Sequence, residues 1–121
     1  LYAPKDARAR RYLGVTLGRR GWYSAGEEEL RRAVELDPRS ADAHYNLASA
    51  LLDLSRWAEA IPRLEKVLQL NANYVRAHRA LGFALAQSGR VAEAVAHYEG
   101  YMRAVPGDTE AAEELRQLRV R

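Results

Sequence analysis

The 121-residue chain contains no cysteine, which excludes disulfides and thiolate metal sites but leaves the redox compartment open. No stretch approaches the roughly 18 consecutive apolar residues that a membrane-spanning helix needs. The sequence also lacks a His-Glu-x-x-His metal motif and a glycine-rich phosphate-binding loop. These absences lead us to expect no enzymatic activity, no cofactor, no bound metal and no direct membrane insertion.

A large charge excess is also missing. The chain has 19 Lys and Arg residues against 16 Asp and Glu residues, for a net charge of +3. Basic residues could bind nucleic acid, and such binding would weaken steeply with salt. Because the acidic residues are interleaved with the basic ones, we expect a solvated arginine-rich surface and no nucleic-acid partner.

What the chain does contain is a period of 34 residues. Proline occupies positions 4, 38 and 106, and Ala72 fills the missing place in that series. The period divides the chain into three units, 7–40, 41–74 and 75–108. The second and third units share ten identical residues. A fixed period of this size is typical of stacked helical units, which present a long surface and seldom carry a reaction centre.

Apolar residues recur at fixed places within the units. Large residues stand at the seventh place (Leu13, Leu47 and Leu81) and at the eleventh (Leu17, Leu51 and Leu85). Small residues stand at the eighth place (Gly14, Ala48 and Gly82) and at the twentieth (Gly26, Ala60 and Ala94). Two closely packed helices need this combination, a small residue where the backbones approach and a large one beside it. Each unit is therefore predicted to be a pair of antiparallel helices.

The expected helix boundaries follow from capping and breaking residues. First helices are predicted at 7–20, 41–54 and 75–87, second helices at 22–37, 56–70 and 90–104, and a seventh, capping helix at 109–119. Asp6, Ser40 and Asp108 precede helices as N-caps, whereas Tyr74 at the same place cannot cap. Ser24 and the three glutamates 27–29 are interpreted as capping groups of a second helix. Pro62 should kink its helix on the solvent side.

The chain resembles the tetratricopeptide repeat (TPR) family. The matching residues are Leu13-Gly14, Leu47-Ala48, Leu81-Gly82, Ala60, Leu64, Ala94, Tyr98, Pro38 and Pro106, with departures at Arg10, His44, His78 and Gly26. The resemblance implies an all-α, right-handed superhelix of about seven helices forming one domain over residues 1–121. Residues 1–6 would then be the tail of a preceding repeat, and residues 109–121 the capping helix. It also implies a protein-interaction scaffold whose first helices line a concave groove.

Several side chains of the first helices fall off the face used for internal packing and should point into that groove. The candidate partner-binding residues are Arg8, Arg11, Arg19, Tyr45, Asn46, Ser49, Arg76, Arg79, Phe83 and Gln87. Arginine and aromatic residues most often anchor interfaces. We therefore expect a peptide or helix of a partner protein that carries carboxylates and apolar side chains.

Some members of the family hold a C-terminal carboxylate pair in a clamp of Lys, Asn, Asn, Lys and Arg. In this chain Arg11 and Asn46 stand at two of those places, and Arg76 stands at a third with Arg in place of Lys. Val15 and Ala80 replace the remaining Asn and Arg. We therefore do not expect clamp-type chaperone binding.

The alternative hypothesis is a structural or oligomerisation segment of a larger protein. Leu1, Tyr2 and Tyr12 would form an open first edge that pairs with another copy of the chain. The Ala-, Arg- and Leu-rich composition favours a bacterial source. We expect a soluble protein and favour a cytoplasmic over a periplasmic location.

Overall fold

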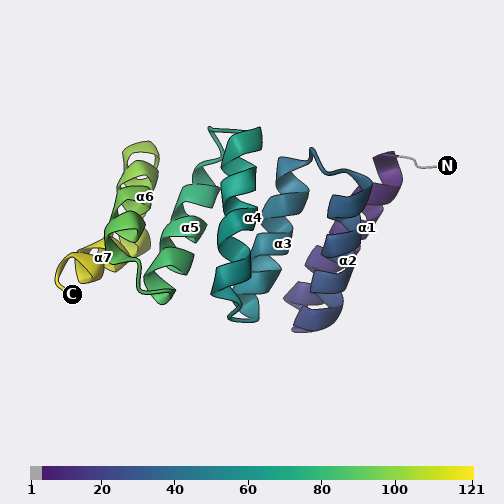
Figure 1. The fold of residues 1–121 in the computed structure, drawn as a ribbon, viewed down its shortest axis with the longest axis horizontal. Coiled ribbons are helices and arrows are strands. Elements are labelled where there is room, and N and C mark those ends of the chain that lie inside the picture. The colour runs from purple at the N-terminus through teal and green to yellow at the C-terminus, as the bar shows by residue number, and fades with distance from the viewer. Residues whose placement is uncertain (1–3) are drawn as a thin grey trace.

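The computed structural model describes residues 4–121, which form seven α-helices and no strand (Figure 1). The helices are α1 (Pro4–Arg19), α2 (Tyr23–Leu36), α3 (Ala41–Asp53), α4 (Trp57–Leu70), α5 (Val75–Gln87), α6 (Val91–Ala104) and α7 (Thr109–Arg119). The predicted all-α fold is therefore confirmed. Every boundary lies within one residue of its predicted position except the start of α1. Among the described residues, no helix is both long enough and apolar enough to cross a membrane.

The helices form a row that runs from α1 and α2 at one end to α6 and α7 at the other (Figure 1). Each helix packs against the next one in the chain, and α3 also contacts both α1 and α5. This nearest-neighbour packing is the arrangement of a solenoid, in which each repeat contacts only its neighbours. Each of the three turns inside the helix pairs contains a residue with positive φ: Gly21 at 85°, Ser55 at 58° and Gly89 at 80°.

Two of the three predicted N-caps are confirmed. The Ser40 side chain accepts a hydrogen bond from the Ala43 backbone N–H at 3.1 Å, and Asp108 accepts one from Ala111 at 3.0 Å. Tyr74 makes no side-chain cap, also as predicted. The third prediction is wrong, because α1 begins at Pro4 and places Asp6 inside the first turn. There its carboxylate favours the helix through the dipole instead. Residues 4–6 thus belong to α1, and the rest of the predicted tail, residues 1–3, lies outside the residues that the structure describes.

The interpretation of Ser24 and the glutamates as capping groups is also wrong. Helix α2 starts at Tyr23, its N-cap position is Trp22, and no side chain caps it. Glu27 is 8% exposed and forms ion pairs with Arg31 and with Arg56, the latter at 2.9 Å. Since Arg56 is the N-cap residue of α4, this carboxylate ties two helix pairs together.

Pro62 lies on the exposed side of α4, and the helix continues past it to Leu70. The opposite side of α4 carries Ala60, Ile61, Leu64 and Val67, all buried. A proline on the outer side removes one backbone hydrogen bond without disturbing the packed face.

Gly26 marks the closest approach between α1 and α2. A Cβ atom at Gly26 would lie 2.8 Å from the backbone oxygen of Gly14, a contact that cannot relax by side-chain rotation. At the twentieth place the other units carry Ala60 and Ala94, both fully buried. The first pair therefore requires glycine at this place, whereas the other two pairs accommodate alanine.

We predict that Gly26→Ala lowers the free energy of unfolding by about 1–3 kcal/mol, because the two helices must separate. Gly18→Ala is the matched control, since a Cβ atom there would meet nothing within 4 Å. It should stabilise α1 by about 0.5–1 kcal/mol through helix propensity. Urea unfolding followed by circular dichroism measures both. Equal effects of the two substitutions would contradict this account of the α1–α2 contact.

Candidate functional site

Four of the ten predicted site residues line one hollow, here called the central cavity. It has a volume of about 300 Å³ and lies between α3, α5, α6 and α7. Its lining consists of Tyr45, Leu52, Arg76, Arg79, Ala80, Phe83, Tyr98, Tyr101 and Glu114. Tyr98, Tyr101 and Glu114 were not among the predicted residues. A sequence signal existed for Glu114, which holds the place of Asn46 in a partial fourth unit.

Other predicted residues line two further hollows. A cavity of about 360 Å³ near the N-terminal end includes Arg19, Asn46 and Ser49. A smaller one of about 160 Å³ near the C-terminal end includes Phe83 and Gln87. Arg8 and Arg11 line none of these three cavities. Arg11 donates instead to the Asn46 side-chain oxygen at 3.1 Å, so two of the predicted residues bind each other.

Arg76 presents a cation at the rim of the central cavity. Its guanidinium lies 4.9 Å from the ring centroid of Tyr45 and 5.7 Å from that of Tyr74. The two rings are themselves 5.1 Å apart, and the Tyr74 hydroxyl donates to Asp42 at 2.7 Å. Burial and that bond to Asp42 raise the pKa of Tyr74 to about 12, so the ring stays neutral.

Arg76 takes part in none of the salt bridges found among the described residues. The side chain is therefore positioned by aromatic rings while its charge is left uncompensated. A cation held over aromatic faces is attracted by their quadrupoles and loses little freedom when it binds an anion.

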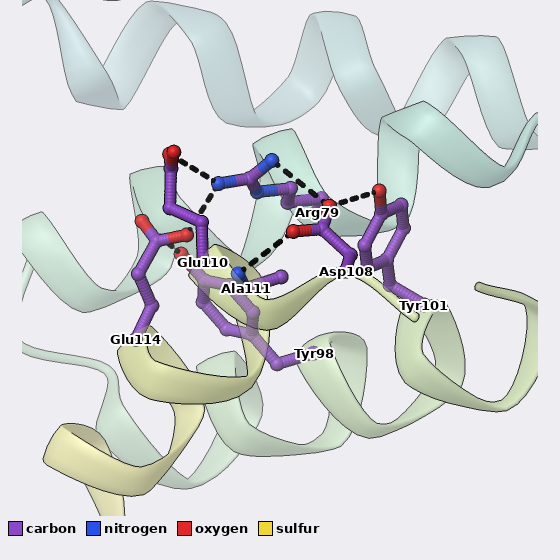
Figure 2. Close-up of polar contacts among 7 residues, drawn as sticks. All are labelled: Arg79, Tyr98, Tyr101, Asp108, Glu110, Ala111 and Glu114. Carbon is purple, nitrogen blue, oxygen red and sulfur yellow. Dashed lines mark hydrogen bonds and ion pairs between the residues drawn. The ribbon is translucent and has the colours of Figure 1, made fainter. Parts of the chain in front are cut away.

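Arg79 occupies a different environment, shown in Figure 2. Its guanidinium donates to Asp108 at 3.2 Å, Glu110 at 2.8 Å and Glu114 at 2.6 Å, all three from the N-terminal part of α7 or its cap. The hydroxyl of Tyr101 donates to Asp108 at 2.6 Å, which together with the Ala111 backbone N–H lowers the pKa of that carboxyl.

The three carboxylates compensate the charge of Arg79. The side chain was predicted to face a ligand, and it does line the central cavity, but its donors are already engaged. Its evident structural role is to hold α7 against α5. The sequence could not show this because Arg79 and Glu114 are 35 residues apart.

Phe83 supplies the apolar side of the central cavity. Its ring is half-buried and packs edge-on against Trp57, with 5.5 Å between the centroids. It lines both the central and the C-terminal cavities. A fixed aromatic ring shared by two hollows can receive apolar side chains from either direction.

Each helix pair also contains one polar contact between its fourth and twenty-third places. These contacts are Arg10–Glu29 at 2.8 Å, Arg63–His44 at 3.3 Å and His78–His97 at 3.1 Å. His44 is buried and donates through Nε2 to the Pro38 carbonyl at 2.8 Å. It therefore serves packing, as expected for a residue at a repeated place. Among the described residues, no three His, Asp or Glu side chains are arranged to hold a metal ion.

We predict that the compensated Arg79 matters more for stability than an exposed arginine. Arg79→Ala should lower the free energy of unfolding by about 1–3 kcal/mol and speed hydrogen exchange throughout α7. Arg116→Ala is the matched control, because Arg116 is 68% exposed and pairs only with Glu113 on its own helix. Its loss should cost less than about 0.5 kcal/mol. An equal loss of unfolding free energy in the two variants would contradict the conclusion that Arg79 holds α7 against α5.

We also predict that the His78–His97 contact makes stability depend on pH. Burial lowers the pKa of both rings, with a further contribution from Arg103 at His78 and from His78 at His97, where Glu65 and Glu93 oppose it. Between these lowered values and the usual 6.5, the unfolded chain binds more protons than the folded one. The free energy of unfolding should therefore fall as the pH drops through about 6.5.

His97→Gln removes one of the three histidines whose pKa is lowered by burial, the third being His44, but keeps a hydrogen-bonding side chain. It should flatten the dependence of stability on pH between about pH 7.5 and pH 5.5, above the range in which most carboxylates titrate. Urea unfolding at several pH values measures the slope. The same slope in the variant and the parent chain would show that the histidine pair does not carry the effect.

Comparisons with known proteins agree with the geometry. The first TPR domain of Spaghetti (RPAP3), bound to the HSP90 peptide SRMEEVD, is similar with a TM-score of 0.92 and 25% identity over 96% of this chain and 92% of that chain. The first TPR domain of human RPAP3 is similar with a TM-score of 0.90 and 26% identity, over 96% of this chain and 91% of that chain. The second TPR domain of human RPAP3, in complex with the HSP70 peptide SGPTIEEVD, has a TM-score of 0.90 and 24% identity over 97% of this chain and 98% of that chain. At this identity the similarity shows the fold alone.

No curated protein sequence matches the chain. A family model for the tetratricopeptide repeat, however, matches residues 13–62 and 45–109, which together cover most of the chain. The seven helices, their solenoid packing and this match lead to one conclusion: the chain belongs to the tetratricopeptide repeat family.

Proposed function

We propose that this chain is a protein-interaction module that binds a peptide or helix of a partner protein on the surface formed by its first helices. The observation that carries the proposal is the central cavity, where the uncompensated cation of Arg76 lies beside an apolar wall. The family supports it, since the Spaghetti TPR domain at 25% identity is bound to a peptide. The proposal assigns no reaction, cofactor or nucleic acid to the chain.

The chemistry of the central cavity indicates the ligand. Arg76 favours a carboxylate, while Leu52, Ala80 and Phe83 favour an apolar side chain next to it. Arg79 and Glu114 form a neutralised wall, so they contribute shape more than charge. We therefore propose a segment in which an acidic residue adjoins a large apolar residue, with affinity from apolar burial and orientation from the arginine.

The ligand is proposed to differ from a clamped C-terminal carboxylate pair. Val15 and Ala80 have no side-chain hydrogen-bond donor at two places of the clamp. At two others, Arg11 and Asn46 are engaged with each other. A peptide such as SRMEEVD would therefore lose the bonds that a full clamp makes at the places of Val15 and Ala80.

The test is selection of peptide ligands from a displayed library, followed by fluorescence anisotropy on purified peptides. We predict that selected peptides combine an acidic with an apolar residue and bind more tightly than SRMEEVD. Phe83→Ala and Arg76→Ala should each weaken binding at least about tenfold, as expected for interface anchors. Arg32→Ala, an exposed arginine on α2, is the matched control and should leave the affinity unchanged.

Two results would overturn the proposal. One is a library that yields no ligand for a folded chain. The other is a set of ligands whose affinity does not respond to Phe83→Ala or Arg76→Ala, because these ligands would bind elsewhere on the molecule.

A further inference from the structure

One face of α1 is exposed from Asp6 to the turn that follows the helix. Its residues follow a spacing of three and four, and all are exposed: Asp6, Ala9, Leu13, Thr16 and, in the turn directly after the helix, Arg20. This spacing places side chains on a single stripe of a helix. Leu13, at its centre, is 46% exposed. Figure 1 shows that α1 lies at the N-terminal end of the row.

The same places form buried interfaces in the next two helix pairs. Ala43, Leu47 and Ala50 of α3 are buried, as are Ala77, Leu81 and Ala84 of α5. Helix α3 packs against α2, and α5 packs against α4. Leu47 is 1% and Leu81 is 2% exposed, against 46% for Leu13. Helix α1 thus carries the small–large pattern of an inter-repeat interface without a covering helix among the described residues.

Aromatic side chains flank this stripe. Trp22 is 61% exposed and Tyr12 is 59% exposed. Trp22 holds the repeat place of Arg56, which reaches back across the preceding interface to Glu27. We therefore infer from this equivalence that Trp22 lies toward the open side of α1. Large exposed apolar groups next to an interface-like stripe mark a contact surface more than isolated surface residues do.

We propose that a second copy of the chain covers this stripe, its α1 packing antiparallel on the first about a two-fold axis beside Leu13. Asp6 and Arg20 each lie seven residues from Leu13, one on either side. The two-fold axis therefore places Asp6 of each copy opposite Arg20 of the other and brings the two Leu13 side chains together. A two-fold interface must be self-complementary in this way.

Neither Asp6 nor Arg20 occurs in a salt bridge of the described residues. Both are exposed at the two ends of the same stripe. The antiparallel pairing compensates both charges twice, whereas a parallel pairing would place like charges together.

The dimer leaves the peptide surface free. Arg11 and Val15 of α1 lie on the opposite side of the helix from Leu13. Two copies would therefore present two peptide-binding surfaces, which raises the avidity for a partner that carries two copies of the recognised segment. One pair of helices buries less than a standard interface of about 1,600 Å², so we expect a dissociation constant on the order of 10–100 µM.

The test is sedimentation equilibrium of the 121-residue chain from about 5 to about 500 µM, a range that brackets this constant. The parent chain should pass from monomer to dimer. Leu13→Asp should weaken the dimer at least about tenfold while circular dichroism stays unchanged, because Leu13 is half-exposed in the monomer. Val120→Asp, at the 77% exposed Val120 near the other end, is the matched control and should dimerise like the parent.

Charge reversal identifies the geometry independently of Leu13. Asp6→Arg and Arg20→Asp should each weaken self-association, since each variant places like charges opposite one another. An equimolar mixture of the two should form a heterodimer in which every opposed pair is again of opposite sign. The proposal is overturned by a parent chain that stays monomeric, by a dimer that tolerates Leu13→Asp, or by single variants that do not restore association when mixed.

Discussion

The interface between consecutive helices is the constraint on which the rest of the molecule depends. No helix here could bury its apolar face alone. Helices α3 and α5 pack against the second helix of the preceding pair, and each carries a buried alanine and leucine at the same places, Ala43 and Leu47 or Ala77 and Leu81. Because this contact repeats at a fixed interval, the helices stack in a row, and the surfaces away from the contact are left for other uses.

The proposed binding surface is a by-product of that stacking. Residues that the internal packing does not need, such as Tyr45, Arg76 and Phe83, are brought to one cavity from positions far apart in the chain. Rigid neighbours hold them there, since Tyr74 stacks beside Tyr45 and Trp57 packs against Phe83. A preorganised site of this kind loses little conformational entropy on binding. Arginines divide between two tasks: Arg79 fastens α7, while Arg76 remains available to a ligand.

The helix boundaries could be predicted closely from the sequence because capping and turn signals are local. Ser40 and Asp108 cap the helices that follow them, and the turn residues Gly21, Ser55 and Gly89 separate the helices of each pair. The predictions were wrong where a side chain could play either of two structural roles that look alike in sequence. Glu27 near a helix start resembles a dipole-compensating residue, but the Arg56 guanidinium lies beside it only after the pairs have stacked. The prediction that Asp6 is an N-cap was wrong for a simpler reason, because α1 already begins at Pro4.

The sequence by itself determined the repeat, the helix pairs and which residues avoid the packed faces, because helix periodicity and capping depend on neighbours a few positions away. Only the tertiary structure decided how those residues are used. It paired Arg11 with Asn46, neutralised Arg79 with three carboxylates, and left Arg76 over two tyrosine rings and Leu13 exposed on α1. Side chains that are tens of residues apart meet only after the helices have packed, and one sequence read alone carries no local sign of such meetings.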